Sequence, residues 1–251
     1  MKQAQVCIVC GGCVGLTLAL GLAKADISVV VLDGAPTQAL PTDEYGLRVS
    51  ALSIASQTLL EQLNVWPEII AQRACAYTHM DVRDADSFGK IAFDNKQLEL
   101  EHLGHIVEND IIRYALIKEL EQQSSATLMF DTQYQQIHQS ESDVFITLKS
   151  GEPIIAKLLV AADGANSAIR KQFNMALSFK DYDHHALVAT VKTKEPHANT
   201  ARQVFLPTGP LAFLPLSDAN THSIVWSTSP NHCDELLAMD DSSFNKAVMA
   251  A

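Results

Sequence analysis

A pair of glycines behind a short apolar run constrains the fold of this chain more than any other feature of its sequence. Residues 6–9 form the apolar run, and Gly12 and Gly15 follow it closely. A helical pattern comes next, and then a β-branched run at residues 27–33. This order predicts a strand, a helix and a parallel strand that are completed within about 30 residues.

The glycines match the G-x-G-x-x-G layout of a dinucleotide-binding loop, except that Cys10 occupies the first position. Gly12 would let backbone N–H groups approach a pyrophosphate, and Gly15 would let the helix pack close to the strand. The helix N-terminus adds the positive end of its dipole. Asp33 ends the second strand, where its carboxylate can accept hydrogen bonds from ribose hydroxyls. The sequence therefore predicts a dinucleotide site.

Cys10 departs from this layout, because its side chain would crowd the backbone or the phosphate at the first turn. The expected penalty is on the order of 1 kcal/mol if the backbone dihedral angle there is unfavourable. We therefore expect a weakened affinity for the cofactor.

Apolar residues at helical spacing predict helices along the first half of the chain. We expect residues 66–67 to end the second of these helices, and Asn109 to begin the next one as its N-cap. The expected apolar positions are Val14, Leu18 and Leu22 in the first helix and Ala55, Leu59 and Leu63 in the second.

The second half of the chain is rich in strand-like runs. Residues 127–130, 144–149 and 154–162 are predicted strands, and the last of them ends at Asp163, before a short helix. From residue 184 to residue 228 only strands and turns are expected, which predicts a second region built on an antiparallel sheet. Its expected strands are residues 186–193, 203–206, 211–216 and 223–228.

The last residues keep a helical pattern to the end of the chain. Phe244, Ala247, Val248 and Ala251 share one helical face, and no glycine or other capping residue follows them. We expect this chain to be the front part of a longer protein.

The charge balance excludes some classes of partner. Lysine and arginine number 18, and aspartate and glutamate number 29, which gives a net charge of −11. Such a surface repels phosphate backbones, so no nucleic acid is expected as a partner. Five cysteines, an odd number, indicate a reduced cytosolic protein rather than a disulfide framework.

Residues 4–23 carry no charge, so a signal peptide or a membrane span is an alternative reading of this segment. The glycines at functional spacing within it favour the nucleotide loop instead. No other stretch is long and apolar enough to span a bilayer, so no transmembrane segment is expected.

Two other kinds of site are alternatives to the nucleotide loop. Cys7, Cys10 and Cys13 form a C-x2-C-x2-C pattern, but Thr17 stands where an iron–sulfur cluster would need its fourth ligand. The histidines lack a cysteine or carboxylate at zinc spacing, so no metal site is expected. A hydrolase is disfavoured because no G-x-S-x-G signature occurs.

The chain resembles the flavin-dependent aromatic monooxygenases of the para-hydroxybenzoate hydroxylase type. The resemblance rests on three features: the dinucleotide loop with Asp33, the D-G pair followed by a serine and an arginine in residues 162–170, and the order of the domain pieces. That order is flavin domain, sheet insertion, flavin domain and sheet. Within that family the chain is most similar to the ubiquinone-biosynthesis hydroxylases, the VisC-like polyprenylphenol hydroxylases. The stretches that carry this similarity are residues 47–52, 102–109, 184–190, 201–205 and 211–216.

The resemblance implies an α/β fold, with a Rossmann-like FAD-binding domain of the para-hydroxybenzoate hydroxylase type and a second, antiparallel-sheet substrate domain. It assigns residues 1–76 and 101–182 to the FAD-binding domain. It assigns residues 77–100 and 183–251 to the substrate-domain sheet, of which the second piece is truncated.

The resemblance also implies roles for single residues. Gly12 and Gly15 would hold the pyrophosphate and Asp33 the adenosine ribose. Asp163 would lie near the nucleotide, and its alternative role is to cap the helix that follows. The remaining cofactor-binding positions are two arginines suited to phosphate, with a solvated surface role as the alternative: Arg48 and Arg113.

Members of the family carry a third flavin motif, G-D-A-x-H, which this chain lacks. We therefore expect the chain to hold FAD poorly or not at all by itself. No catalytic base can be named from the sequence. Four side chains are candidates for the route of an isoprenoid tail, and each of them would otherwise fill the core of the sheet: Phe205, Phe213, Leu214 and Trp226.

The implied activity is FAD-dependent hydroxylation of a polyprenylated phenol ring in ubiquinone biosynthesis, with NAD(P)H as electron donor. The expected partners are the polyprenylphenol substrate, a second copy of the chain in a homo-oligomer, and a ubiquinone-biosynthesis protein assembly. The expected location is the cytoplasm, with membrane association through the lipophilic substrate left open.

Three alternatives to this activity stay open. The chain could be a non-catalytic fragment or interaction module, or another flavoprotein oxidoreductase of the same fold. An NAD-dependent dehydrogenase is the third, because Tyr114 and Lys118 have the Tyr-x-x-x-Lys spacing.

Overall fold

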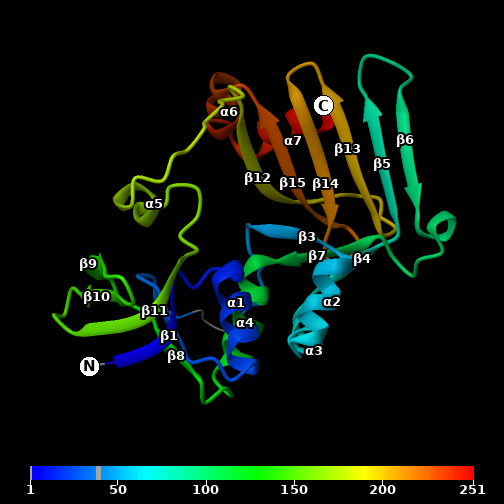
Figure 1. Cartoon of the computed structure of the whole chain (residues 1–251). Helices are drawn as coiled ribbons and strands as arrows, with labels where there is room; N and C mark the ends of the chain where they lie inside the picture. Colours follow the sequence, from blue (N-terminus) through cyan, green and yellow to red (C-terminus); the bar gives the residue numbers. More distant parts are fainter. Residues whose placement is uncertain (1, 38–40) are drawn as a thin grey trace. The chain divides into compact units, whose positions relative to one another are not determined.

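The two apolar runs at the glycine loop form neighbouring strands of one sheet in the computed structural model, which describes residues 2–37 and 41–251 (Figure 1). The strands nearest the loop are parallel; beyond β11, β10 is antiparallel to β11 and β9 is antiparallel to β10. In spatial order the six strands are β8 (Ala126–Met129), β2 (Val29–Leu32), β1 (Lys2–Val9), β11 (Pro153–Ala161), β10 (Val144–Leu148) and β9 (Tyr134–Gln139).

Helices complete this first unit. α1 (Cys13–Lys24) packs against α4 (Asn109–Leu120), and α3 (Trp66–Gln72) packs against α4. A short helix, α5 (Ala168–Gln172), follows β11. All four residues of β2 are buried, as expected for a strand in a parallel sheet that is covered on both faces.

A second unit contains two more sheets. The smaller sheet is antiparallel and has the order β3 (Val49–Ser53), β7 (Gly104–Glu108) and β4 (Cys75–Tyr77). The 3-10 helix η1 (Asn95–Leu98) precedes β7. The larger sheet has the order β12 (His185–Lys192), β15 (Thr221–Thr228), β14 (Gly209–Pro215), β13 (Thr200–Leu206), β5 (His79–Asp84) and β6 (Lys90–Asp94).

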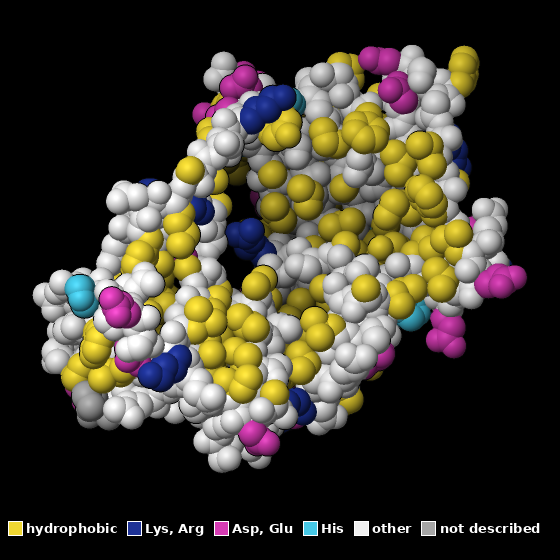
Figure 2. Space-filling view, viewed as in Figure 1, with side chains coloured by type: hydrophobic (Ala, Val, Ile, Leu, Met, Phe, Trp, Pro, Cys, Tyr) yellow, Lys and Arg dark blue, Asp and Glu magenta, His cyan; other side chains and the backbone are white. Residues whose placement is uncertain are grey.

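The two faces of the larger sheet differ in character. One face packs with α6 (Pro230–Leu237) and α7 (Asp241–Ala250) around a core that includes Ile224 and Trp226. Hydrophobic side chains also gather on the opposite face (Figure 2). Part of that face, with Ala201 and Leu214, packs in a second core with Tyr77 and Ile106 of the smaller sheet. Another part is exposed, and Ile91 there is 60% exposed.

The chain divides into two compact units along boundaries that differ from the predicted domain limits. The first unit comprises Met1–Asp43, Thr58–Gln72 and Asn109–Ser178. The second comprises Glu44–Gln57, Arg73–Glu108 and Phe179–Ala251. The main difference is that β3, β4 and β7 all belong to the second unit. They do so because β3 and β4 both pair with β7 in one sheet. α2 (Ile54–Gln62) contributes residues to both units.

The predicted apolar faces of the first two helices are wrong in part. Val14 is 78% exposed and Leu18 is also exposed, whereas the buried side of α1 carries Leu16 and Leu20 with glycine and alanine. In α2 the buried leucine is Leu60 rather than Leu59. The prediction considered only large apolar side chains. Small residues can also form the buried face of a helix, because they let it pack closely against its neighbours.

Two further predictions are corrected. Residues 66–67 do not end a helix but begin α3, because proline is tolerated in the first turn of a helix, where its missing N–H has no partner to lose. The larger sheet is not wholly antiparallel, because β13 pairs with β5 in parallel. The strand β5 comes from a distant part of the chain, so no hairpin sets its direction.

Candidate nucleotide site

The turn from β1 into α1 has the backbone shape of a nucleotide loop. Cys10 has φ of 89°, in the region that favours glycine, and its N–H donates to Leu32 O at 2.7 Å. Gly12 is extended and precedes α1 as a cap without a side-chain hydrogen bond. The first N–H groups of any helix have no partner within the helix, and the positive end of the dipole lies there. The loop therefore presents donors to an anion.

The glycines of the loop meet different constraints. A Cβ at Gly15 would lie 2.1 Å from Cys10 O, so no side chain fits at this position. A Cβ at Gly11 would lie 2.8 Å from Asp33 Oδ2. At Gly12, by contrast, the nearest atom to such a Cβ is Cys10 Sγ at 3.8 Å. Gly15 is thus required by packing, and Gly12 borders open space.

Asp33 and Arg113 are joined to the loop through Gly11. The Gly11 N–H donates to Asp33 Oδ2 at 2.9 Å, and Ala35 N–H donates to Asp33 Oδ1 at 2.9 Å. Arg113 Nε donates to Gly11 O at 2.9 Å, and its Nη2 lies 3.6 Å from Asp33 Oδ2. A carboxylate oxygen has two lone pairs, so Asp33 retains acceptor capacity toward ribose hydroxyls.

Gly11 is a residue of this site that sequence reasoning missed. Its N–H holds the acid and its carbonyl oxygen holds the arginine. The available signal was its place inside the loop, beside the strand end that carries Asp33.

Asp163 lies directly after β11 and caps α5. Its Oδ2 accepts from Ala168 N–H at 2.9 Å and from Ile169 N–H at 3.4 Å. Burial alone would raise the pKa of this carboxyl, but the hydrogen bonds from Ser167, Ile169 and Ala168 outweigh it and hold the pKa below its usual value. The capping role proposed as an alternative is therefore present in the structure.

The second oxygen of Asp163 is in a different situation. Its Oδ1 is buried and has no hydrogen-bond partner among the described residues. A buried acceptor without a donor is unfavourable, so this oxygen is available to a donor from a bound group. Asp163 can therefore serve both the helix and a ligand.

Asp33 and Asp163 line one groove of about 430 Å³ at the carboxyl ends of the strands. Cys10 and Lys149 line the same groove. In open α/β sheets, ligands bind at this edge. The structure thus brings together five of the six predicted site residues, all in the first unit: Gly12, Gly15, Asp33, Arg113 and Asp163. Arg48, the sixth, belongs to the second unit.

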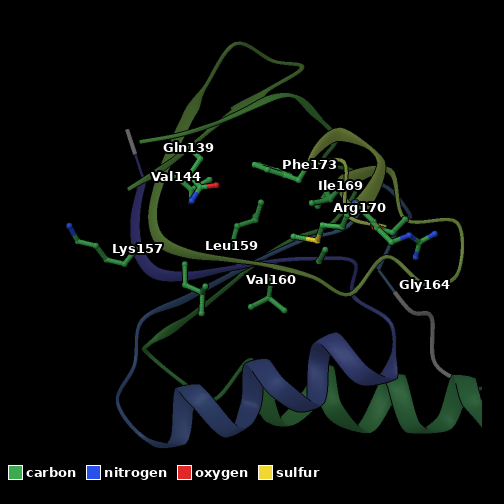
Figure 3. A pocket seen from close by; sticks show the side chains of 13 residues that line it. Gln139, Val144, Lys157, Leu159, Val160, Gly164, Ile169, Arg170 and Phe173 are labelled. Atoms are coloured by element: carbon green, nitrogen blue, oxygen red, sulfur yellow. The ribbon is translucent and has the colours of Figure 1, made fainter. Parts of the chain in front are cut away.

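A larger cavity, of about 590 Å³, lies between β11 and α5. Figure 3 shows Leu159 and Phe173 at this cavity, while the Lys157 side chain extends away from it. The pairing of β11 with β1 extends to residues 158–161, whereas β10 pairs only with residues 153–156. The largely apolar side chains around this cavity do not suit a pyrophosphate, so the smaller groove is the better nucleotide site.

The structure gives no support to the cysteine pattern as a cluster site or to the Tyr-x-x-x-Lys pattern as a catalytic pair. Cys7 is fully buried, and burial raises the pKa of its thiol to about 12. An iron–sulfur ligand must be a thiolate, so this environment disfavours a cluster. Lys118 pairs with Glu68 at 2.7 Å, which engages the lysine of the Tyr-x-x-x-Lys pattern. Across residues 2–37 and 41–251, no helix has the length and apolar character needed to cross a membrane.

Comparisons with known proteins agree with this geometry. The family described as the FAD binding domain matches residues 3–241. Ubiquinone biosynthesis monooxygenase COQ6, mitochondrial, of Danio rerio is 41% identical over 219 residues, which are 83% of this chain and 45% of that protein. The 3-demethoxyubiquinol 3-hydroxylase of Escherichia coli strain K12 is 35% identical over 240 residues, 95% of this chain and 61% of that protein.

The fold is shared with solved structures. P. aeruginosa PqsL in complex with 2-aminobenzoylacetate matches with a TM-score of 0.79 at 18% identity, over 94% of this chain and 64% of that chain. This likeness confirms the expected α/β fold of the para-hydroxybenzoate hydroxylase type. The chain spans about half the length of the curated relatives it matches. With a match over nearly its whole length, the chain belongs to the FAD binding domain family.

Proposed function

We propose that the loop and the groove bind the adenosine-diphosphate half of FAD, in a flavin-dependent monooxygenase that hydroxylates a polyprenylated phenol ring in ubiquinone biosynthesis. The observation that carries the proposal is the loop itself. Packing requires Gly15, space is open at Gly12, and an acid stands at the tip of the next strand. The names of the relatives supply the class of reaction.

The residues fit this half of the cofactor. The N-terminus of α1 would hold the pyrophosphate, and Arg113, which donates to Gly11 O in the loop, would add a positive charge. Asp33 would accept hydrogen bonds from the ribose, and Asp163 Oδ1 would gain the donor it lacks. We also propose Arg48 as a flavin-contacting residue, on the strength of the resemblance. The bound flavin would supply the redox chemistry that activates oxygen.

The exposed apolar part of the larger sheet suits the apolar part of such a substrate. Phe205 is 48% exposed and lies between Val204 and Leu206, which pack in the core beneath α6 and α7, so it is on the opposite face. Phe213 and Trp226 belong to that core, and Leu214 packs in the core with Tyr77 and Ile106, so these three side chains fill cores. We propose that the exposed face with Phe205 contacts the isoprenoid tail.

The electron donor, the partners and the location are part of the proposal. We propose NAD(P)H as donor, and a homo-oligomer that joins a ubiquinone-biosynthesis assembly. A cytoplasmic enzyme that reaches its substrate at membranes fits the lipophilic tail. The domain roles follow the resemblance: the first unit binds FAD and the larger sheet binds the substrate.

Titration of the purified chain with FAD, followed by flavin fluorescence, tests the cofactor site. We expect weak but saturable binding, and Asp33→Asn should raise the Kd at least about tenfold, because a charge-assisted hydrogen bond contributes that much. Asp143→Asn is the matched control, because Asp143 pairs with Lys157 at the surface at 2.8 Å. Saturable binding with equal Kd values for both variants would refute the site.

The reaction needs a second measurement. Oxygen uptake should be coupled to formation of a hydroxylated polyprenylphenol when NAD(P)H and FAD are supplied. Uptake without hydroxylated product would favour another flavoprotein oxidoreductase of the same fold. Binding of FAD with neither uptake nor product would favour a non-catalytic fragment or interaction module.

A further inference from the structure

The strand β6 stands at one end of the larger sheet, and within the described residues it pairs with β5 on one side (Figure 1). An edge strand presents backbone N–H and C=O groups that can pair with another chain. Two large apolar side chains of β6 are exposed, Ile91 by 60% and Phe93 by 45%. This edge therefore offers both backbone groups and apolar area to a further strand.

The backbone groups of β6 that face the free edge belong to alternate residues. At the two ends of the strand, Gly89 O accepts from Asp84 N–H and Asn95 N–H donates to Thr78 O, both at 3.0 Å. Gly89 and Asn95 therefore point toward the β5 side of the hairpin. In an antiparallel pair, residues that bond to one neighbour alternate with residues that point to the other side. Three residues of β6 thus direct their N–H and C=O groups to the free edge: Lys90, Ala92 and Asp94.

The sequence of β6, Lys-Ile-Ala-Phe-Asp, is complementary to itself when it runs antiparallel to a second copy. With Ala92 opposite Ala92 of the second copy, Lys90 lies opposite Asp94 at both ends. The outward-facing residues then meet one another, so their N–H and C=O groups can pair as in an ordinary antiparallel ladder. On the opposite face of the strand, Ile91 meets Phe93 as an apolar cross-strand pair.

Charge selects this register over the others. A shift of the centre by two residues places lysine opposite lysine or aspartate opposite aspartate, and parallel strands place like charges side by side. Like charges directly opposite are destabilising, whereas opposite charges stabilise a cross-strand pair. A lysine on an edge strand ordinarily blocks pairing. In the register centred on Ala92, the second copy supplies an aspartate opposite this lysine.

The two charged side chains of β6 keep capacity for such a pair. Lys90 Nζ lies 3.6 Å from Asp81 Oδ1, and the lysine side chain is 50% exposed. Asp94 Oδ1 accepts from Lys96 N–H at 2.9 Å, and its Oδ2 lies 3.6 Å from His79 Nε2. Both ion-pair distances exceed that of a direct charge-assisted hydrogen bond. Lys90 and Asp94 can therefore each take a closer partner.

We propose that β6 is the contact surface of a symmetric dimer of this chain, in which the larger sheets of two copies join edge to edge. The same strand serves both copies, so the contact closes on itself and builds no open fibre. One short strand from each copy makes a small interface, so the dimer dissociates on dilution. This inference rests on the homo-oligomer of the proposed function, and it involves neither FAD nor substrate. All the residues that it uses belong to the second unit.

Sedimentation velocity over a concentration series tests this surface. The wild type should form dimers that dissociate into single chains on dilution. Lys90→Asp should weaken dimerisation at least about tenfold, because both symmetric charge pairs change from attraction to repulsion. Lys192→Asp is the matched control, because it makes the same charge change on β12, at the other edge of the same sheet. It should dimerise as the wild type does.

A mixing experiment tests the register. Asp94→Lys should also weaken dimerisation, because it places lysine opposite lysine. An equal mixture of Lys90→Asp chains and Asp94→Lys chains should regain at least the wild-type association, because a strand with two acids then meets a strand with two lysines. A variant that had merely lost its fold would not be rescued in this way.

Ala92→Pro tests the backbone pairing, also where Asp94→Lys loses the cap of η1. Proline removes an N–H that points away from β5, and edge strands tolerate proline at such positions. The variant should keep the circular dichroism spectrum and the Kd for FAD of the wild type but should not dimerise. The cofactor site and the dimer surface are thus tested separately.

Four outcomes overturn the proposal: a wild type that stays monomeric up to millimolar concentration, a mixture that stays monomeric, a folded Ala92→Pro that dimerises as the wild type does, or a Lys192→Asp weakened as much as Lys90→Asp.

Discussion

Cys10 turns the chain from β1 into the glycine loop with φ of 89°. A residue with a Cβ is strained in this conformation, and glycine is not. Cys10→Gly should therefore raise the free energy of unfolding by about 1 kcal/mol, and it should tighten FAD binding because no side chain crowds the loop. Cys10→Ala is the matched control for urea unfolding, since it removes the sulfur and keeps the Cβ. A gain in Cys10→Ala equal to that in Cys10→Gly would contradict the explanation.

His222 is a second residue in an unusual environment. It is 3% exposed, and its ring packs edge-on against His197 with 5.4 Å between the ring centroids. Burial, and then the nearby charges of His197 and Arg202, lower the pKa of His222 to about 4. Unfolded histidine has a pKa of about 6.5. Below that pH the unfolded chain binds the proton more readily, so the free energy of unfolding falls with pH.

The expected loss from this residue is about 3 kcal/mol between pH 6.5 and pH 4, and little of it appears above pH 7. Urea unfolding at several pH values in this window measures it. His222→Leu should flatten the slope, whereas the exposed His138→Gln should leave the slope as in the wild type. A slope that survives in His222→Leu would show that another group controls acid stability.

At the scale of one element, α5 depends on side-chain caps at its N-terminus. Asp163 Oδ2 accepts from two of its first N–H groups, and Ser167 Oγ accepts from Arg170 N–H at 2.9 Å. Asp163→Ala should lower the free energy of unfolding by about 1 kcal/mol. Asp163→Asn keeps an acceptor oxygen and should lose less.

The pH dependence of this cap has a definite sign. The pKa of Asp163 is lowered in the folded chain, so its charge contributes stability above its ordinary value of about 3.9. That contribution is lost as the pH falls through the folded pKa. The stability advantage of the wild type over Asp163→Asn should therefore be constant near neutral pH and vanish in acid. An advantage that grows as the pH falls would refute the cap.

The elements differ in how far the sequence reveals them. β1, β2 and the loop could be predicted because glycine spacing and β-branched runs are local signals. β9 was missed because its residues are mostly polar and only Ile137 is buried. The hydrogen bonds of Gly11 to Asp33 and to Arg113 join residues far apart in the chain, so no local pattern contains them.

At the scale of the whole molecule, two tryptophans report on the two units separately. Trp66 belongs to the first unit and Trp226 to the second, and both are buried. The Trp226→Phe variant keeps Trp66 as the fluorescent reporter of urea unfolding in the first unit. The Trp66→Phe variant keeps Trp226 as the reporter in the second unit. A ligand that binds only the folded state, at about 100 times its Kd, raises the free energy of unfolding by about 2.7 kcal/mol.

The proposed nucleotide loop belongs to the first unit, which contains Asp33 and Arg113. FAD should therefore raise the unfolding midpoint that Trp66 reports in the Trp226→Phe variant. In the Asp33→Asn background this shift should shrink, because the loop then loses its proposed contact with the ribose. An equal shift in that background would show that Asp33 does not contact the nucleotide.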